Sequence, residues 1–315
     1  MKSFSKELEE KPGATEVYSA VMTSSHHPPT DLPSVLVTDL TYKAGFGPVL
    51  LENINLDLPP GSRCLLCGAN GAGKTTLLQV LAGKHMVPPS AVQILGRPAF
   101  HDLSLVTTGD LGYLGTQWRS GAGTPGGGQP LKGNLSARTL IYGVQGADPA
   151  RRDRLLRLLD IDLEWTMLSA SDGQRRRVQI AMGLLLPYKV LLLDEITVDM
   201  DVLGRLDLLH FFKQECEERG ASIVYATHIF DGLEGWPTHL AYMEGGKVVK
   251  GGLWAGIHEL EGGQRLLATV EQWLLKEKKE RRAAMAAGGC KQDALTTAAK
   301  QPAPMMPSRH MAYFR

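Results

Sequence analysis

The sequence predicts an α/β fold built on a sheet with parallel strands. Two short apolar runs, residues 190–193 and 223–226, have the composition of strands buried on both faces, and a predicted helix over residues 206–219 separates them. Strand–helix–strand alternation of this kind is typical of α/β proteins. A third apolar run, residues 64–67, leads through a glycine-rich turn into a helix predicted over residues 74–82.

Hydrophobic periodicity predicts the remaining elements. Residues 35–37 form a predicted strand, and residues 54–58 alternate apolar and polar side chains, which indicates a half-buried strand. A Pro-Pro-Gly-Ser turn at residues 59–62 then reverses the chain. Residues 149–159 and 178–186 are predicted helices, and a proline ends the second one.

Composition excludes several classes of protein. The chain has 315 residues, of which 43% are hydrophobic and 21% charged, close to a globular average. No uncharged apolar stretch reaches eighteen residues, so a polytopic membrane protein is excluded. The net charge of +1 gives no global field that would favour nucleic acid or an anionic membrane.

We expect three parts along the chain. Residues 1–32 form a disordered lead, residues 33–260 the main domain, and residues 261–315 a helix followed by a basic, disordered tail. That last segment carries ten Lys/Arg against five Asp/Glu, a charge of +5 (10 − 5). Charge runs are usually solvated, so nucleic-acid contact is the less favoured interpretation. A glycine-rich, low-complexity segment, residues 119–133, is expected to be a mobile surface loop.

The cysteines predict no disulfide framework. The chain has four, and Cys64 and Cys67 form a C-x-x-C within a predicted strand. Residues three apart on a strand point to opposite faces, so these thiols should not meet. We therefore expect buried, inert thiols in a reducing compartment.

The strongest motif lies between the predicted strand and helix and matches G-x-x-x-x-G-K-T in full. It consists of Gly68, Ala69, Asn70, Gly71, Ala72, Gly73, Lys74 and Thr75, with Thr76 next in the helix. Glycines let backbone N–H groups turn toward a phosphate, and the helix N-terminus adds a positive dipole. Lys74 would place its ammonium on the β- and γ-phosphates, and the Thr75 hydroxyl would ligate Mg²⁺. The motif predicts binding of ATP and Mg²⁺.

A second motif places two acids directly after the buried strand 190–193. Ligands of parallel sheets bind at the carboxyl ends of the strands. Asp194 suits Mg²⁺, directly or through water, and Glu195 is placed to polarise an attacking water. A strand followed by two solvated acids is the ordinary alternative. The G-x-x-x-x-G-K-T motif at residues 68–75, called the phosphate loop below, disfavours it.

The segment Ser171-Asp172-Gly173-Gln174 would, alone, be typical of a helix N-cap. Gln174 lies 20 residues before Asp194 (194 − 174), with one predicted helix between them. At that spacing the four residues resemble the signature loop of ATP-binding cassette (ABC) ATPases, usually written LSGGQ. The resemblance implies that they contact an ATP molecule bound by a second chain.

Other residues resemble further ABC motifs. His228 follows the strand 223–226 and is similar to the switch histidine that contacts the γ-phosphate, and residues 198–201 occupy the place of the D-loop. Tyr42 lies 26 residues before Gly68 (68 − 42), where the family stacks an aromatic ring on adenine. An ordinary core tyrosine is the alternative, and Phe46 is a less favoured candidate for the same role.

The resemblance to ABC ATPases covers residues 35–249, with the motifs in the family's order. The chain is similar to the small, soluble group without membrane spans, in particular to plant subfamily I non-intrinsic proteins and a fungal ATPase associated with the Ccr4–Not complex. Residues 61–66, 81–85, 171–179 and 225–233 carry that likeness. It implies an ABC-type P-loop fold, with a mixed sheet core, an antiparallel β-subdomain and a small α-helical subdomain.

Three positions depart from the family pattern. Asp172 replaces the first glycine of the signature and would repel a γ-phosphate unless it points away. Ile196 replaces the usual proline after the two acids, which we expect to be a mild change. Gln117, after a predicted strand over residues 111–114, is displaced by one position from the usual Q-loop glutamine and is assigned to sense Mg²⁺ and water.

The resemblance implies an ATP hydrolase that forms a homodimer on ATP binding. Mg²⁺ would be held by Thr75, Gln117 and Asp194, with Glu195 and His228 as catalytic residues. We expect a cytoplasmic or nuclear protein that drives or regulates an assembly such as a Ccr4–Not-like complex. One alternative is the nucleotide-binding subunit of a transporter whose membrane domain is a separate chain. Another is a regulatory module that binds ATP and hydrolyses little.

Overall fold

The computed structural model describes residues 32–115, 135–198, 200–260 and 265–286. The expected N-terminal lead, apart from Leu32, lies outside the described residues, as do the glycine-rich segment and the basic tail. The described helices and strands all belong to one compact unit, which begins at Pro33.

An antiparallel sheet is formed by the early part of the chain. Its order is β2 (Val49–Leu58), β1 (Val35–Lys43), β4 (Val92–Ile94) and β5 (Arg97–Pro98), and each neighbouring pair is antiparallel. Strand β1 extends beyond the predicted range 35–37. Its pairing with β2 shifts in register between Val37 and Leu40, around Asp39, which has a φ of 47°. This bulge interrupts the alternation on which the prediction rested.

A second, mixed sheet carries the chemistry-bearing loops. Its order is β10 (Lys247–Leu253), β9 (His239–Glu244), β3 (Arg63–Gly68), β8 (Ser222–Ala226), β7 (Val190–Asp194) and β6 (Leu111–Leu114). All neighbours are parallel except β10 and β9. The two sheets and the helices give the mixed α/β architecture that the sequence predicts.

The two faces of the second sheet face different cores. Cys64 belongs to a buried cluster with the antiparallel sheet and α2 (Lys74–Leu81), and Cys67 to a cluster with the later helices. The predicted separation of these free thiols is therefore confirmed. Burial raises the pKa of the Cys64 thiol to about 12, so it is protonated and unreactive at neutral pH.

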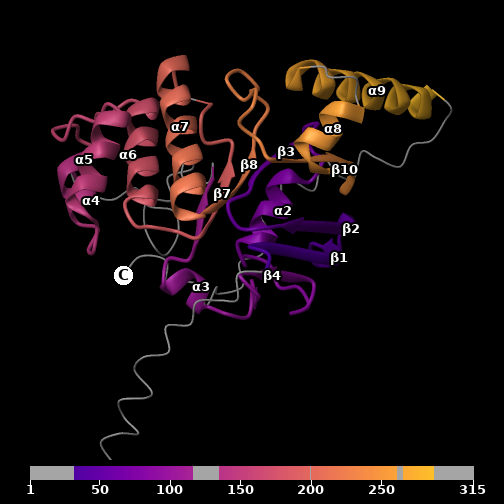
Figure 1. Ribbon diagram of the computed structural model, residues 1–315, viewed down its shortest axis with the longest axis horizontal. Helices are drawn as coiled ribbons and strands as arrows, with labels where there is room; N and C mark the ends of the chain where they lie inside the picture. Colours follow the sequence, from indigo (N-terminus) through magenta and orange to yellow (C-terminus); the bar gives the residue numbers. More distant parts are fainter. Residues whose placement is uncertain (1–31, 116–134, 199, 261–264, 287–315) are drawn as a thin grey trace, which may run out of the picture. The chain divides into compact units, whose positions relative to one another are not determined.

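The helical subdomain groups α4 (Ala137–Tyr142), α5 (Pro149–Leu158) and α6 (Asp172–Leu184) beside α7 (Val202–Arg219), as Figure 1 shows. The predicted starts of the last two helices, at 178 and 206, were too late. Ser171 caps α6 with a capping box and Asp201 caps α7 by accepting from the Gly204 N–H. Polar cap residues precede the apolar pattern, so periodicity alone misses the first turn.

Three further helices complete the described fold: α3 (Ser104–Thr107), α8 (Trp254–Leu260) and α9 (Leu266–Ala286). Helix α9 packs on β9, where the Tyr242 hydroxyl donates to the buried Glu277 carboxylate at 2.7 Å and Trp273 meets the Tyr242 ring edge-on. Within the described residues, no helix is long and apolar enough to span a bilayer.

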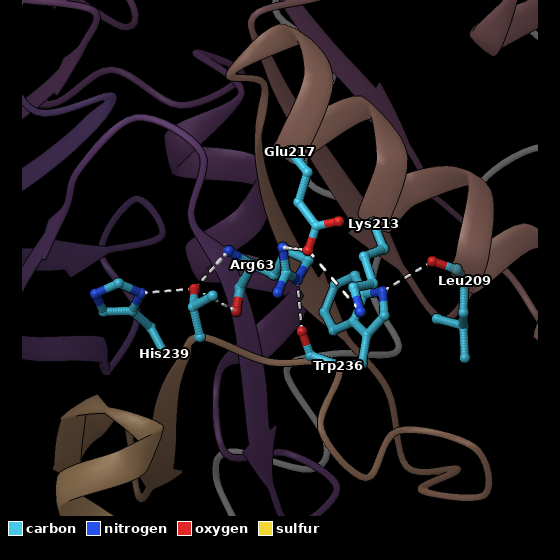
Figure 2. A network of polar contacts seen from close by, with 7 residues as sticks. Arg63, Leu209, Lys213, Glu217, Trp236 and His239 are labelled. Atoms are coloured by element: carbon cyan, nitrogen blue, oxygen red, sulfur yellow. Dashed lines mark hydrogen bonds and ion pairs between the residues drawn. The ribbon is translucent and has the colours of Figure 1, made fainter.

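Arg63, at the start of β3, links the strand that leads into the phosphate loop to helix α7 and to the segment before β9 (Figure 2). Its Nε donates to the Trp236 carbonyl at 2.6 Å, and its guanidinium pairs with Glu217 of α7 at 3.3 Å. The Trp236 indole N–H donates in turn to the Leu209 carbonyl of α7 at 3.0 Å. This network also anchors the segment that leads from His228 back to β9.

Candidate functional site

The predicted chemistry-bearing residues meet at one edge of the second sheet. Strands β3 and β7 both pair in parallel with β8, so the loops after these three strands leave the same edge. Those loops carry the phosphate loop, the acids Asp194 and Glu195, and His228. A site assembled at the carboxyl ends of parallel strands is typical of α/β folds.

The phosphate loop is shaped by glycines that no other residue could replace easily. Gly68, Gly71 and Gly73 have φ values of 146°, 83° and 101°. A Cβ on Gly68 would lie 2.2 Å from the Met243 carbonyl oxygen, and one on Gly73 would lie 3.0 Å from Leu51. Gly73 is the N-cap of α2 and supplies no capping side chain, so the helix presents backbone N–H groups to an anion.

The Lys74 side chain hydrogen-bonds to the backbone at the start of the phosphate loop. Its Nζ donates to the carbonyls of Gly68 at 2.7 Å and Ala69 at 3.0 Å. Burial lowers the pKa of Lys74, an effect that Glu195 and Asp194 partly offset. Polyphosphate oxygens would give this buried ammonium an anionic partner in place of neutral carbonyls. The other predicted loop residues, Asn70, Ala72, Thr75 and Thr76, line the same turn and the start of α2.

Asp194 ends β7 as a buried carboxylate, 2% exposed, with a donor on each oxygen. Oδ1 accepts from the Thr75 hydroxyl at 3.2 Å and Oδ2 from the Tyr113 hydroxyl at 3.3 Å. Burial raises the pKa of Asp194, so a cation here would stabilise its charged form.

The residues around Asp194 fit Mg²⁺. Carboxylate and hydroxyl oxygens are the ligands it prefers, and it takes few protein ligands when phosphates complete its shell. Among the described residues, no group of three or more His, Cys, Asp or Glu side chains is arranged to hold a metal ion by itself. Gln117, the third predicted ligand, lies outside the described residues, so its role stays a prediction.

Glu195 and His228 are brought together from neighbouring strands. The His228 Nδ1 lies 3.2 Å from the Glu195 carboxylate. Glu195 has a φ of 50°, and its N–H donates to the Ala226 carbonyl at 2.9 Å. A left-handed backbone at a non-glycine residue is strained and clusters at functional sites. Here it turns the chain sharply after β7, next to the strand that leads to His228.

The signature residues lie at the start of α6, in the helical subdomain. The Ser171 hydroxyl accepts from the Gln174 N–H and the Gln174 side chain accepts from the Ser171 N–H. Asp172 is 87% exposed at its side chain and pairs with Arg175 at 2.6 Å. Arg175 therefore compensates part of the charge that was expected to repel a γ-phosphate.

The D-loop region, which the structure describes except for residue 199, is linked by an ion pair to α6, the helix that begins at the signature. Arg177 of α6 pairs with Asp201 at 3.1 Å and with Asp160 at 3.4 Å. Next to it, the buried Arg176 donates to the Gly115 carbonyl at 2.9 Å, at the end of β6. The helix that carries the signature is thus tied to both neighbouring loops.

The two aromatic candidates for adenine differ in their surroundings. The Tyr42 ring contacts the His85 ring, with centroids 5.0 Å apart, and His85 follows the far end of α2 from the phosphate loop. Phe46, in the turn between β1 and β2, is fully exposed. The Phe46 ring is therefore accessible to a base, whereas the Tyr42 ring packs on His85. The roles of both residues stay predictions.

Sequence reasoning missed Tyr113 and Lys84. Tyr113 lies on β6, which pairs with β7, and the Lys84 ammonium lies 3.7 Å from the centroid of its ring. Burial lowers the pKa of Lys84 to about 8, an effect that Asp194 partly offsets. The sequence offered one signal for Lys84, because residues 81–85 are one of the runs in which the chain resembles ABC ATPases.

Comparison with known proteins identifies the family. The ABC transporter family model matches residues 51–198. ABC transporter I family member 21 of Arabidopsis thaliana is 56% identical over 264 residues, covering 84% of this chain and 89% of the relative. CCR4-associated factor 16 of Saccharomyces cerevisiae is 43% identical, covering 69% of this chain and 77% of the relative.

Solved structures share the fold. The ATP-binding subunit of an ABC transporter has a TM-score of 0.60 at 24% identity, covering 76% of this chain and 99% of that one. A dimeric ATP-binding cassette bound to ADP and Pi has a TM-score of 0.56 at 22% identity, covering 70% and 98%. The chain belongs to the ABC family, and its nucleotide-binding domain is of the class that binds and hydrolyses ATP.

Proposed function

We propose that this chain hydrolyses ATP at a site that only a second chain completes, and that the resulting opening and closing drives or regulates a cytoplasmic or nuclear assembly. The observation that carries the proposal is the meeting of Lys74, Asp194, Glu195 and His228 at one sheet edge. The signature at Ser171 belongs instead to a separate helical subdomain. One chain offers one phosphate loop and one signature, so two chains arranged head to tail would form two sites.

Each residue has a role that follows from its position. Lys74 and the N–H groups of α2 would hold the β- and γ-phosphates. Thr75 and Asp194 would ligate Mg²⁺, which neutralises phosphate charge when bound. Glu195 would orient the attacking water, and His228, within hydrogen-bond distance of Glu195, would contact the γ-phosphate. Catalysis would rest on positioning and electrostatics.

The composite site is tested by sizing a hydrolysis-deficient variant. Glu195→Gln keeps the side-chain shape and removes the carboxylate, so ATP binding should persist while turnover falls by orders of magnitude. The variant should then accumulate as an ATP-bound dimer in size-exclusion chromatography with light scattering. A Glu195→Gln protein with wild-type turnover would contradict the role of Glu195.

A second variant tests the signature. Adding Gly173→Asp to Glu195→Gln places a charge against the partner's γ-phosphate, so the ATP-dependent dimer should disappear. The affinity of each monomer for ATP should remain, since its own phosphate loop is unchanged. If the first variant stays monomeric with ATP, the homodimer is wrong: either Asp172 prevents two identical chains from closing, or the partner is a different ABC chain.

The alternative function is the nucleotide-binding subunit of a transporter whose membrane domain is another chain. The ATP-binding protein EcfA2 of an energy-coupling factor transporter from Lactiplantibacillus plantarum, 31% identical over 225 residues, favours it. The relative named CCR4-associated factor 16 favours a Ccr4–Not-like assembly. Affinity purification without crosslinking distinguishes the two, because the transporter function requires an integral membrane subunit among the retained proteins.

A further inference from the structure

Asp194 is held on the oxygen opposite to Thr75 by Tyr113, which lies outside the motifs described above. The Tyr113 hydroxyl donates to Oδ2 of Asp194 at 3.3 Å, while the Thr75 hydroxyl donates to Oδ1 at 3.2 Å. A carboxylate with one donor on each oxygen cannot rotate about its Cβ–Cγ bond without breaking both hydrogen bonds. Tyr113 comes from β6, which pairs with β7 and places Tyr113 opposite Leu192 in the register.

The Tyr113 ring is itself braced by the end of helix α2. The Lys84 ammonium lies over its face, 3.7 Å from the centroid, a geometry in which a cation is attracted to an aromatic ring. Gln79 of α2 hydrogen-bonds to the Tyr113 side chain and, at 3.1 Å, to His85. Residues from one helix and the turn after it thus fix the ring, and helix α2 also carries Thr75 at its other end.

We propose that Tyr113, braced by Lys84, is a positioning residue that orients Asp194 so that its Oδ1 faces Thr75 and the metal. Groups that orient a metal-ligating carboxylate typically change metal affinity about 10- to 100-fold when removed. This inference rests on the proposed Mg²⁺ site at Thr75 and Asp194.

The test measures metal affinity apart from turnover. The full chain is saturated with ADP and titrated with Mn²⁺, and bound metal is followed by electron paramagnetic resonance. Tyr113→Phe, which keeps the ring and removes the hydroxyl, should raise the Mn²⁺ dissociation constant about tenfold. ADP affinity in EDTA should stay unchanged, because the proposed role of Tyr113 acts on the nucleotide only through the metal.

Lys84 variants separate charge from packing. Lys84→Met keeps the apolar stem and should raise the Mn²⁺ dissociation constant, whereas Lys84→Arg, whose guanidinium can also lie over the ring, should restore it. The matched control is the pair Tyr142 and Arg152, where Arg152 lies 4.1 Å from the ring centroid in the helical subdomain. Tyr142→Phe and Arg152→Met should leave Mn²⁺ affinity unchanged.

Asp194→Asn distinguishes failure of this inference from failure of the metal site. Loss of Mn²⁺ binding in Asp194→Asn, with unchanged affinity in Tyr113→Phe, would overturn the positioning role alone. Unchanged Mn²⁺ binding in Asp194→Asn would overturn the proposed metal site itself. A Tyr113→Phe protein that loses ADP affinity in EDTA to the same degree would show a general structural role and also overturn the inference.

Discussion

At the scale of single residues, Lys74 is the group on which nucleotide binding depends most directly. Its ammonium is buried and donates to the carbonyls of Gly68 and Ala69 in the phosphate loop. Lys74→Ala should weaken ATP binding on the order of 100-fold, since a charge-assisted hydrogen bond contributes about 1.5–3 kcal/mol. Isothermal titration calorimetry measures this, with Lys276→Ala on α9, where the side chain is 77% exposed, as control. Unchanged affinity in Lys74→Ala would refute the phosphate site.

The aromatic platform for adenine is a second prediction at this scale. Phe46→Ala should weaken ATP binding about tenfold, because stacking on a base contributes about 1–3 kcal/mol. Binding of inorganic triphosphate should not change, since it has no base. Tyr42→Ala should instead lower the melting temperature, because the Tyr42 ring packs on His85. If Tyr42→Ala weakens ATP binding but not triphosphate binding, and Phe46→Ala does not, Tyr42 is the platform.

At the scale of elements, a largely buried arginine joins the helical subdomain to α7. Arg151 of α5 binds both carboxylate oxygens of Glu215 of α7 at 2.8 Å and donates to the Leu184 carbonyl, at the end of α6, at 2.7 Å. Glu215 is 4% exposed and also pairs with Arg219 at 2.9 Å. The three helices are therefore fixed to one another far from the signature.

Arg151→Met should lower the free energy of unfolding by about 3 kcal/mol, because it leaves a buried carboxylate only partly compensated. Urea unfolding followed by circular dichroism measures the change. Arg138→Met removes a pair with Glu164 in which both side chains are exposed, and should change stability little. Equal changes in the free energy of unfolding for the two variants would show that the buried pair stabilises the fold no more than the exposed pair.

At the scale of the whole molecule, an ionic group joins the two sheets. Asp110, just before β6, pairs with Arg97 of β5 at 2.6 Å and with Lys189, just before β7, at 3.1 Å. Burial alone would raise the pKa of the Asp110 carboxyl, but hydrogen bonds from Arg97 and Lys189 outweigh it, and the pKa is lowered. The charged form is therefore favoured in the folded state.

This shift predicts acid-sensitive stability. A depressed folded-state pKa contributes stability that is fully present above the unfolded value, about 3.9, and is lost as the pH falls through the folded value. The melting temperature of Asp110→Asn should be lower than that of the wild type at pH 6, and the difference should shrink as the pH falls below 4. A difference that is independent of pH would exclude the titration of Asp110 as its cause.

Local sequence patterns were enough to define the chemistry-bearing loops and their place in the fold. A phosphate loop between a strand and a helix, and two acids after a buried strand, are patterns whose residue types are dictated by phosphate and metal chemistry. The parallel pairing of β3, β8 and β7 follows from strand–helix–strand alternation, and it brings Lys74, Asp194 and His228 to one edge. The likeness to ABC ATPases, in which the motifs occur in the same order, then implied the roles of Ser171 and His228.

The side chains that support those loops could be found only from tertiary contacts. Tyr113 and Asp194 are 81 residues apart, and their hydrogen bond depends on the pairing of β6 with β7. Spacing assigned the adenine platform to Tyr42, but the packing of its ring on His85 and the exposure of Phe46 are visible only in the structure. These contacts are long-range or depend on backbone geometry, which periodicity does not record.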